Sequence, residues 1–333
     1  MDRPNFEEFF EGTLRGRLQA MEEVRSNLKF RALGCVALAV GVGGVVGLAW
    51  VRSFSGLAWV RSFSLEPMVF IVPGPLTLIL AGYFWFRPGW QDYVARFKGE
   101  IIAEVVRFIS PDLRYQPGAM ISRDAYVGSG IFPKEPHRYN GEDYVSGKVG
   151  ATALRFSEIH SEYKTETTDR NGHRTEHWHT IFRGLFFEGD FNKHFGARTY
   201  VLTDVAEKWL GTLVGQAVQG SHQSAELVKL EDPVFEKEFV VHGTDQIEAR
   251  YILSPALMTR IVEFKKKAGR AVQFSFIDSN VYVAIPYSKN LFEPRLFRSG
   301  VSLEQIKGYY EALALTISIV EDLNLNTRIW TKA

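Results

Sequence analysis

The chain has 333 residues and carries 39 lysine and arginine residues against 38 aspartate and glutamate residues. Nucleic-acid binding is dominated by the neutralisation of phosphates, so this near-neutral balance argues against a nucleic-acid partner. The single cysteine, Cys35, excludes an intrachain disulfide.

Residues 1–31 are expected to form a juxtamembrane amphipathic helix, because their apolar residues fall at heptad spacing. Residues 87–110, opened by Pro88 and ended by Ser110 and Pro111, predict a stalk helix that packs against it. The heptad could instead pair between chains, which would make the stalk an assembly element. The residues expected to carry that assembly are Leu14, Met21, Val24 and Leu28.

Two uncharged stretches, 32–51 and 67–86, each have the roughly 20 residues that a helix needs to cross a bilayer. They predict a transmembrane helical hairpin over residues 32–86 that contacts the lipid bilayer. Small residues four positions apart let helices approach closely, and the expected packing residues are Ala37, Gly41, Gly43 and Gly47. Tryptophans prefer the headgroup zone, and the expected interfacial anchors are Trp50, Trp59, Trp85 and Trp90.

The connection between the two stretches contains a tandem repeat, because GLAWVRSFS occurs twice over residues 47–64. We interpret it as a recent duplication in a tolerant loop; a functional reach into the periplasm is the alternative. Lysine and arginine are concentrated outside the hairpin, with Arg52 and Arg61 between the spans. This asymmetry predicts a two-pass protein of the bacterial inner (cytoplasmic) membrane with both termini cytoplasmic.

Residues 111–333 are expected to form a cytoplasmic α+β domain, a largely antiparallel mixed sheet with packed helices. Strands are predicted at Arg198–Leu202, 227–230 and 235–242, with a hairpin over 272–277 and 281–286. Helices are predicted at 204–220, 254–269 and from Ser302 onward, each with a capping residue at its start. A weak internal echo suggests two related halves, 118–220 and 227–333.

The clearest strand signal is a hairpin formed by residues 152–168 and 173–188 around Asn171-Gly172. A two-residue turn at that dipeptide would pair Arg170 with His173 and so fix the register. The face expected to be apolar contains Ile159, Tyr163, Trp178, Phe182 and Phe186. The face expected to be polar contains Glu158, His160, Glu162, Glu166, His177, His179 and Arg183.

In this register Glu166 lies opposite His177, with His179 on the same face, an arrangement that could hold a divalent metal. The alternative is a solvated polar hairpin tip, with Glu158, His160, Glu162 and Arg183 in a cross-strand charge network. The chain contains no phosphate-binding, nucleophile-elbow, zinc-protease or paired-cysteine motif. We therefore expect no catalytic residue and no cofactor.

Several segments resemble a bacterial membrane-protein family known as domain of unknown function 3137. They are Asn140–Asp143, Phe156–Glu158, Phe235–Val241, Asp245–Leu253 and Phe292–Pro294. The resemblance implies an N-terminal hairpin before a domain of this kind and implies no chemistry or site residue.

The resulting hypothesis is a membrane-anchored, non-enzymatic interaction or assembly (scaffold) protein. Its expected partners are the lipid bilayer, further copies of itself as a homo-oligomer, and an unidentified protein. The alternative is a membrane-tethered enzyme, or a sensor of a small ligand or metal, with a pocket in the cytoplasmic domain.

Overall fold

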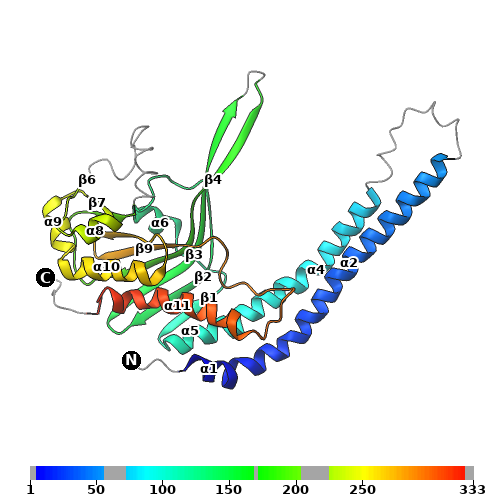
Figure 1. The fold of residues 1–333 in the computed structure, drawn as a ribbon, viewed down its shortest axis with the longest axis horizontal. Coiled ribbons are helices and arrows are strands. Elements are labelled where there is room, and N and C mark those ends of the chain that lie inside the picture. The colour runs from blue at the N-terminus through cyan, green and yellow to red at the C-terminus, as the bar shows by residue number, and fades with distance from the viewer. Residues whose placement is uncertain (1–4, 56–72, 169–171, 204–224, 327–333) are drawn as a thin grey trace. The chain divides into compact units, whose positions relative to one another are not determined.

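The computed structural model describes residues 5–55, 73–168, 172–203 and 225–326, without the side chains of 42–55 and 73–80 (Figure 1). The chain divides into two compact units. Unit 1 comprises Met1–Ile101 and Glu293–Lys307, and unit 2 comprises Ile102–Phe292 and Gly308–Ala333. A segment from the C-terminal third therefore belongs with the N-terminal helices, which the predicted boundary at residue 110 does not anticipate.

Unit 1 is built on a long helical rod. The helix α1 (Phe6–Phe9), the π-helical turn η1 (Phe10–Leu14) and α2 (Arg15–Ser55) follow one another without a break. At 41 residues, α2 is about 60 Å long and joins the predicted juxtamembrane helix to the predicted first span. Helix α4 (Pro73–Phe97) lies beside it (Figure 1). The predicted second span lies partly outside the described residues, since 67–72 are not described.

The buried stripe that runs from the end of η1 along α2 alternates steps of four and three residues, as in a coiled-coil seam. Its most buried members are Leu14, Leu18, Met21, Arg25 and Leu28. The predicted heptad was therefore wrong at Val24, which is 37% exposed, and it missed Leu18 and Arg25. Because Leu14, Met21 and Leu28 are buried within their own chain, they offer no surface for assembly between chains.

The two helices approach closely at glycines of α4. A Cβ at Gly82 would lie 3.0 Å from the Cβ of Cys35, and one at Gly89 would lie 3.0 Å from a methyl of Leu28. The predicted packing residues Ala37 and Gly41 are exposed instead, because the stripe passes through Cys35 and Ala39. The surroundings of the other two predicted packing residues, Gly43 and Gly47, are outside the described side chains.

Helix α4 does not begin where the stalk was predicted to begin. Pro88 lies inside it, so the carbonyl of Phe84 lacks its helical donor there. The π-helical turn η3 (Lys98–Ile102) and α5 (Ala103–Ile109) continue the helix to Ser110, as predicted. The π-helical turn explains why buried side chains at the end of α4 recur every fourth residue, at Tyr93, Phe97 and Ile101.

Segment 293–307 is held to the helices of unit 1 by charged side chains. Lys98 is buried, with 3% of the residue exposed, and its ammonium lies 2.7 Å from the Glu293 carboxylate. Arg25 donates to the carbonyl of Leu296, and the Gly300 backbone N–H donates to Glu22 at 2.9 Å. Burial alone would raise the pKa of Glu22, but the hydrogen bonds from Arg25 and Gly300 outweigh it and lower that pKa.

Unit 2 contains, in the described residues, a nine-stranded antiparallel sheet of order β1-β2-β3-β4-β9-β8-β5-β7-β6. The strands β1 to β5 are Leu113–Gln116, Arg138–Val149, Thr152–Thr168, Arg174–Asp190 and Thr199–Leu202. The strands β6 to β9 are Glu226–Leu227, Val240–Gly243, Gln273–Ile277 and Asn280–Pro286. The predicted α+β class is therefore confirmed. Strands from the two predicted halves interleave, because β5 lies between β8 and β7.

The helices of unit 2 begin at the expected capping residues where they were predicted. Helix α10 (Pro255–Ala268) is capped by Ser254 and ends at Gly269, whose φ is 62°. Helix α11 (Leu303–Asp322) also matches its prediction. The helices α6 (Arg123–Gly128), α8 (Pro233–Glu238) and α9 (Gln246–Ile252) were not predicted. The predicted helix 204–220 lies outside the described residues.

The predicted strand 235–242 was wrong in its first half. Asp232 accepts hydrogen bonds from the backbone of Val234 and Phe235, and Pro233 occupies the first turn, so α8 forms before β7 begins. The preceding prediction, strand 227–230, was wrong beyond Leu227, because β6 comprises Glu226 and Leu227. Strand β1 was not anticipated.

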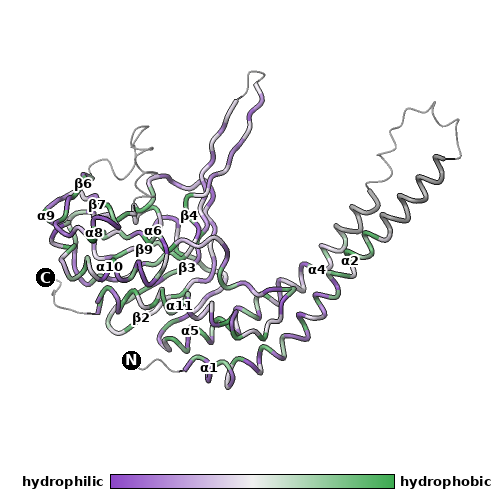
Figure 2. Tube along the Cα trace, in the orientation of Figure 1, coloured by the Kyte–Doolittle hydropathy of each residue, from purple (hydrophilic) through white to green (hydrophobic). Residues whose placement is uncertain are grey.

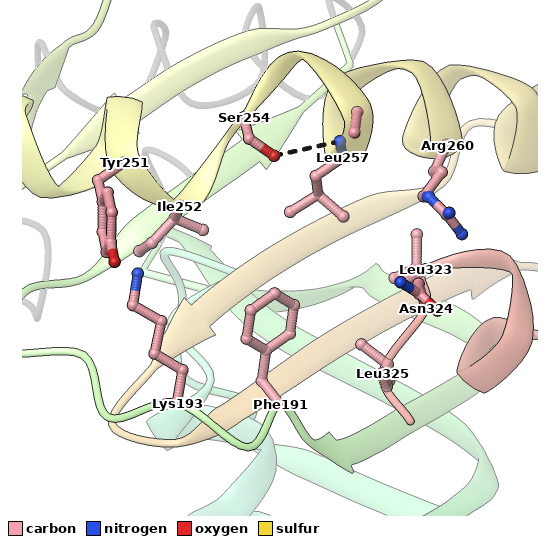
Figure 3. Close-up of a pocket in the computed structure, with 11 residues that line it drawn as sticks. Phe191, Lys193, Tyr251, Ile252, Ser254, Leu257, Arg260, Leu323, Asn324 and Leu325 are labelled. Carbon is pink, nitrogen blue, oxygen red and sulfur yellow. Dashed lines mark hydrogen bonds between the residues drawn. The ribbon is translucent and has the colours of Figure 1, made fainter. Parts of the chain in front are cut away.

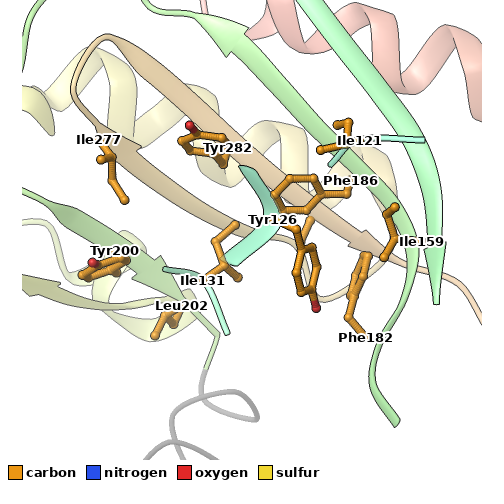
Figure 4. Packing of buried hydrophobic residues seen from close by; sticks show 11 residues of the cluster. Ile121, Tyr126, Ile131, Ile159, Phe182, Phe186, Tyr200, Leu202, Ile277 and Tyr282 are labelled. Carbon is orange, nitrogen blue, oxygen red and sulfur yellow. The ribbon is translucent and has the colours of Figure 1, made fainter. Parts of the chain in front are cut away.

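One face of the sheet is covered by segment 117–136, which includes α6 (Figure 4). Tyr126 lies at the centre of this apolar cluster, among Ile159, Phe182 and Phe186. The other face packs against helices, as where Phe264 of α10 meets Phe274 of β8 with ring centroids 6.2 Å apart.

Buried serines of the sheet form hydrogen bonds with polar groups of segment 117–136, which covers the face described above. The Ser157 hydroxyl accepts from the backbone of Ile121 at 3.0 Å, and the Ser275 hydroxyl donates to the carbonyl of Ser129 at 2.7 Å. The Ser161 and Tyr126 hydroxyls lie 2.7 Å apart. Because a buried polar group without a partner is costly, these serines allow segment 117–136, most of which lies outside α6, to pack on the sheet.

We predict that the Lys98–Glu293 pair couples segment 293–307 to unit 1. In a double-mutant cycle, Lys98→Met and Glu293→Gln should each lower the free energy of unfolding by about 1–3 kcal/mol. Their coupling should be about 1 kcal/mol or more, measured by urea denaturation. The control is the exposed pair of Arg15 and Glu11, for which a coupling near 0.3 kcal/mol is expected. Equal coupling in the two pairs would contradict the prediction.

We also predict that Gly141 cannot be replaced. A Cβ at this position would lie 2.5 Å from the carbonyl oxygen of Glu158, so Gly141→Ala should lower the free energy of unfolding by about 2 kcal/mol or more. Gly128→Ala is the matched control, since a Cβ there meets no atom within 4 Å. The prediction would be contradicted if urea unfolding gave the two variants the same free energy of unfolding. Strands β2 and β3 would then accommodate the added methyl group without loss of stability.

Candidate functional site

Strands β3 and β4 extend beyond the sheet as a two-stranded projection (Figure 1). Strand β2 pairs with β3 only as far as Glu162, and β9 pairs with β4 only from Gly184 onward. Within the described residues, 163–168 and 174–179 therefore have only each other as strand neighbours. We call these two stretches the arm. Its residues are mostly hydrophilic, as Figure 2 shows, and mostly exposed.

The predicted hairpin register holds in the sheet and fails in the arm. Ser161 pairs with Phe182 as predicted, but Glu162 pairs with Thr180, which leaves Ile181 as an extra residue. Ile181 packs against the apolar cluster of the sheet, so its burial favours the bulge. Thr168 pairs with Arg174, one position away from the predicted register, and Arg170 and Asn171 lie outside the described residues.

This shift separates the residues of the predicted metal site. His177 lies opposite Thr165 and His179 opposite Tyr163, whereas Glu166 pairs with Glu176 and contacts Lys164 at 2.7 Å. Side chains alternate between faces, so Glu166 lies on the face away from both histidines. The expectation that Glu166 joins them is therefore wrong. In the part of the chain that is described, no cluster of three potential metal ligands occurs.

Hydrogen bonds and ring contacts hold the arm straight. The Thr165 hydroxyl lies 2.9 Å from Nε2 of His179, and the Lys164 ammonium bridges Glu166 and Glu176. At the base of the arm, the Arg138 guanidinium lies 3.4 Å from the ring centroid of Trp178. Trp178 thus sits on the charged face, contrary to the predicted apolar face.

The residues of the predicted cross-strand charge network lie near the base of the arm, but the Arg183 guanidinium donates to Asn290, and His160 lies 3.8 Å from Glu162 on its own strand. Glu142 lies directly opposite Glu158, and His160 lies opposite Arg183. Like charges directly opposite each other destabilise a sheet. Here the Asn290 amide donates to Glu142 at 2.9 Å, and the Leu291 backbone N–H donates to Glu158 at 2.9 Å.

Two of the five segments that carried the family resemblance lie side by side in the sheet. Asn140–Asp143 and Phe156–Glu158 lie on adjacent strands, and the residues just before Phe292 bind their carboxylates. The Asp143 carboxylate also accepts a hydrogen bond, from the Tyr115 hydroxyl. Because each carboxylate accepts from a neighbouring segment, the arrangement is that of a structural clasp between loops and sheet.

A pocket of about 220 Å³ lies between α9, α10, the end of α11 and the segment after β4 (Figure 3). Its apolar lining includes the side chains of Ile252, Leu257, Leu323 and Leu325, all buried, and the ring of Phe191. Lys193 and Arg260 also line it.

Sequence reasoning missed this pocket. Its residues come from three separate stretches of the chain, and the one local signal was the cap formed by Ser254 and Pro255.

Two basic side chains give the pocket its charge. The Lys193 ammonium lies 3.2 Å from the ring centroid of Tyr251, and Arg260 donates to the carbonyl of Asp322 at 3.4 Å. Burial lowers the pKa of Lys193, and the nearby Glu248 partly offsets this. The Glu248 carboxylate accepts from the Gly196 backbone at 2.9 Å.

Unit 1 exposes large apolar side chains on both helices. Val36, Leu38 and Val40 of α2 are 61–70% exposed, and Phe84 and Trp85 of α4 are 65% and 58% exposed. Among the helices with described residues, none is both long and apolar enough to cross a bilayer. The transmembrane hairpin therefore stays a prediction.

The four predicted interfacial anchors have different outcomes. The exposed Trp85 carries the Arg31 guanidinium 5.0 Å from its ring centroid. Trp90 is half-buried and stacks on Tyr93 at 5.6 Å, so it packs within unit 1. Trp59 and the side chain of Trp50 lie outside the description.

Comparison with known proteins adds one family and one structure. Residues 180–325 match the family model described as "Protein of unknown function (DUF3137)". No curated protein matches the chain. The chain is similar to the crystal structure of the mycobacterial trehalose monomycolate transport factor A, TtfA, with a TM-score of 0.35 and 11% identity over 66% of this chain and 96% of that chain. The family resemblance that the sequence indicated is thus confirmed over residues 180–325.

Proposed function

We propose that unit 1 anchors this protein in a membrane and that the protein acts as a non-enzymatic interaction or assembly protein. Unit 2 then stands on the cytoplasmic side of a bacterial inner membrane and presents the arm to a protein partner, including further copies of the same chain. The observation that carries the proposal is the exposed apolar surface of α2 and α4.

This surface is distinct from the seam between the two helices. The seam side of α2 is occupied by Cys35 and Ala39, while Val36, Leu38 and Val40 project elsewhere around the helix. A helix that is apolar on every side belongs in a protein interior or a bilayer. Apolar surface exposed to water costs about 25 cal/mol of free energy per Å², and contact with lipid removes this cost.

The arm supports the interaction part of the proposal. A two-stranded hairpin is at best marginally stable alone, and its outer edges carry backbone groups that can pair with another strand. Cation–ring contacts from Arg138 to Trp178 and from Lys134 to Tyr163 attach its base to the start of β2 and the segment before it. An element of this kind suits recognition by strand addition or by clasping a second copy.

The membrane part is tested by placing charge on the exposed apolar surface. The double variant Val36→Arg and Val40→Arg should abolish co-flotation of the full chain with lipid vesicles, because each arginine at a helix centre opposes insertion by about 2.5–3.5 kcal/mol. Ile247→Arg is the matched control, since Ile247 is 80% exposed but lies on α9 of unit 2. Anchoring would be refuted if the double variant floated with the vesicles as the wild type does, or if the wild-type chain stayed in the aqueous fraction.

The assembly part is tested by removing the arm. Lys164 and Trp178 are directly paired, so Asn-Gly in place of residues 165–177 closes a short hairpin between them. The mass of the detergent-solubilised full chain should fall from oligomer to monomer, while the melting temperature changes little. The Thr165→Ala single variant serves as a control that keeps the arm. A wild-type chain that is monomeric at all concentrations, or an oligomer that survives arm removal, would contradict assembly through the arm.

A further inference from the structure

The pocket beside α10 combines an apolar interior with basic side chains, and its lining contains no aspartate or glutamate side chain among the described residues. We propose that it binds a small organic anion, namely a carboxylate on a short aromatic or aliphatic body. This inference does not depend on membrane anchoring or on the arm.

The size and apolar lining set the body of the ligand. A dry cavity of about 150 Å³ accepts benzene, so 220 Å³ accommodates a ring with one substituent. Leu257 of α10 and the two leucines just after α11, Leu323 and Leu325, are each buried to 6% exposure or less. Figure 3 shows the Phe191 ring between the two basic side chains, where it offers a face to an apolar group.

The basic side chains set the charge of the ligand. In Figure 3 the Lys193 ammonium lies on the Tyr251 side of the pocket and the Arg260 guanidinium lies on the Leu323 side. A carboxylate can therefore contact one cation while the apolar body fills the space between them. A cationic ligand would be repelled by both side chains, and a neutral one would desolvate them without an ionic partner.

The start of α10 adds a weaker contribution of the same sign. Ser254 and Ala256 line the pocket, and the Ser254 hydroxyl accepts from the Leu257 backbone at 3.4 Å. Pro255 has no N–H, which leaves the Ala256 N–H as a first-turn donor without an intrahelical acceptor. The positive end of the 14-residue helix favours an anion nearby.

The chemistry also separates this ligand from a plain inorganic anion. Phosphate would use the two cations but would leave the leucine and phenylalanine surface in contact with water. An organic carboxylate uses both parts of the lining, so it should bind more tightly than phosphate.

The experiment is a calorimetric or NMR titration of the purified full chain with sodium benzoate. Benzamide, which has the same shape without the charge, and inorganic phosphate, which has charge without the ring, are the comparison probes. For a ligand of this size we expect saturable binding of benzoate with a dissociation constant of about 1 mM. Benzamide and phosphate should each bind at least about tenfold more weakly.

Variants locate the site. Lys193→Met and Arg260→Met keep the apolar stems, and at least one of them should weaken benzoate binding about tenfold or more. Lys289→Met is the matched control, because Lys289 is an exposed lysine of unit 2 outside the pocket. Thermal unfolding of each variant checks folding, and Lys193→Gln or Arg260→Gln replaces a variant that melts early.

Four results would overturn the proposal, the first three of which concern benzoate. They are no saturable benzoate binding, equal binding of benzamide and benzoate, and benzoate binding that neither pocket variant weakens. Phosphate binding as tight as that of benzoate would also overturn it, because the apolar lining would then play no part.

Discussion

The β3–β4 ladder is the constraint on which the rest of unit 2 depends. Each strand has 17 residues, and the same pair of strands forms the centre of the sheet and the projecting arm. In the sheet, Ile159 lies between Gly141 and Gly184 on the neighbouring strands, where added side-chain atoms would meet backbone. This close approach lets β2, β3, β4 and β9 pack tightly side by side. The arm continues β3 and β4, so the sheet sets its direction.

Polar side chains inside unit 2 hold irregular segments against this sheet. Three serines form hydrogen bonds with the segment that covers one face of the sheet. On the other face, the opposed carboxylates of Glu142 and Glu158 accept hydrogen bonds from the segment before Phe292. Unit 1 uses the same principle with charge, since Lys98 and Arg25 hold segment 293–307. In each case the apolar layers supply most of the burial, and a few hydrogen bonds decide which loop lies where.

Local signals predicted much of the fold. The capping residue Ser254 and Gly269 marked α10, and alternating apolar residues marked the two hairpins, because these signals act over a few residues. The predictions failed where burial outweighed local preference. Val24 fits the heptad but is exposed, whereas Arg25 is buried because a distant carbonyl accepts from it. The pocket could not be predicted, because its lining comes together only through the tertiary fold.

The extra residue Ile181 has a further meaning for how this protein can vary. The pairing register of β3 and β4 shifts by one residue at this position. The arm and the sheet therefore follow different registers along the same two strands. Residues can be gained, lost or exchanged toward the tip without turning the interior of unit 2 outward.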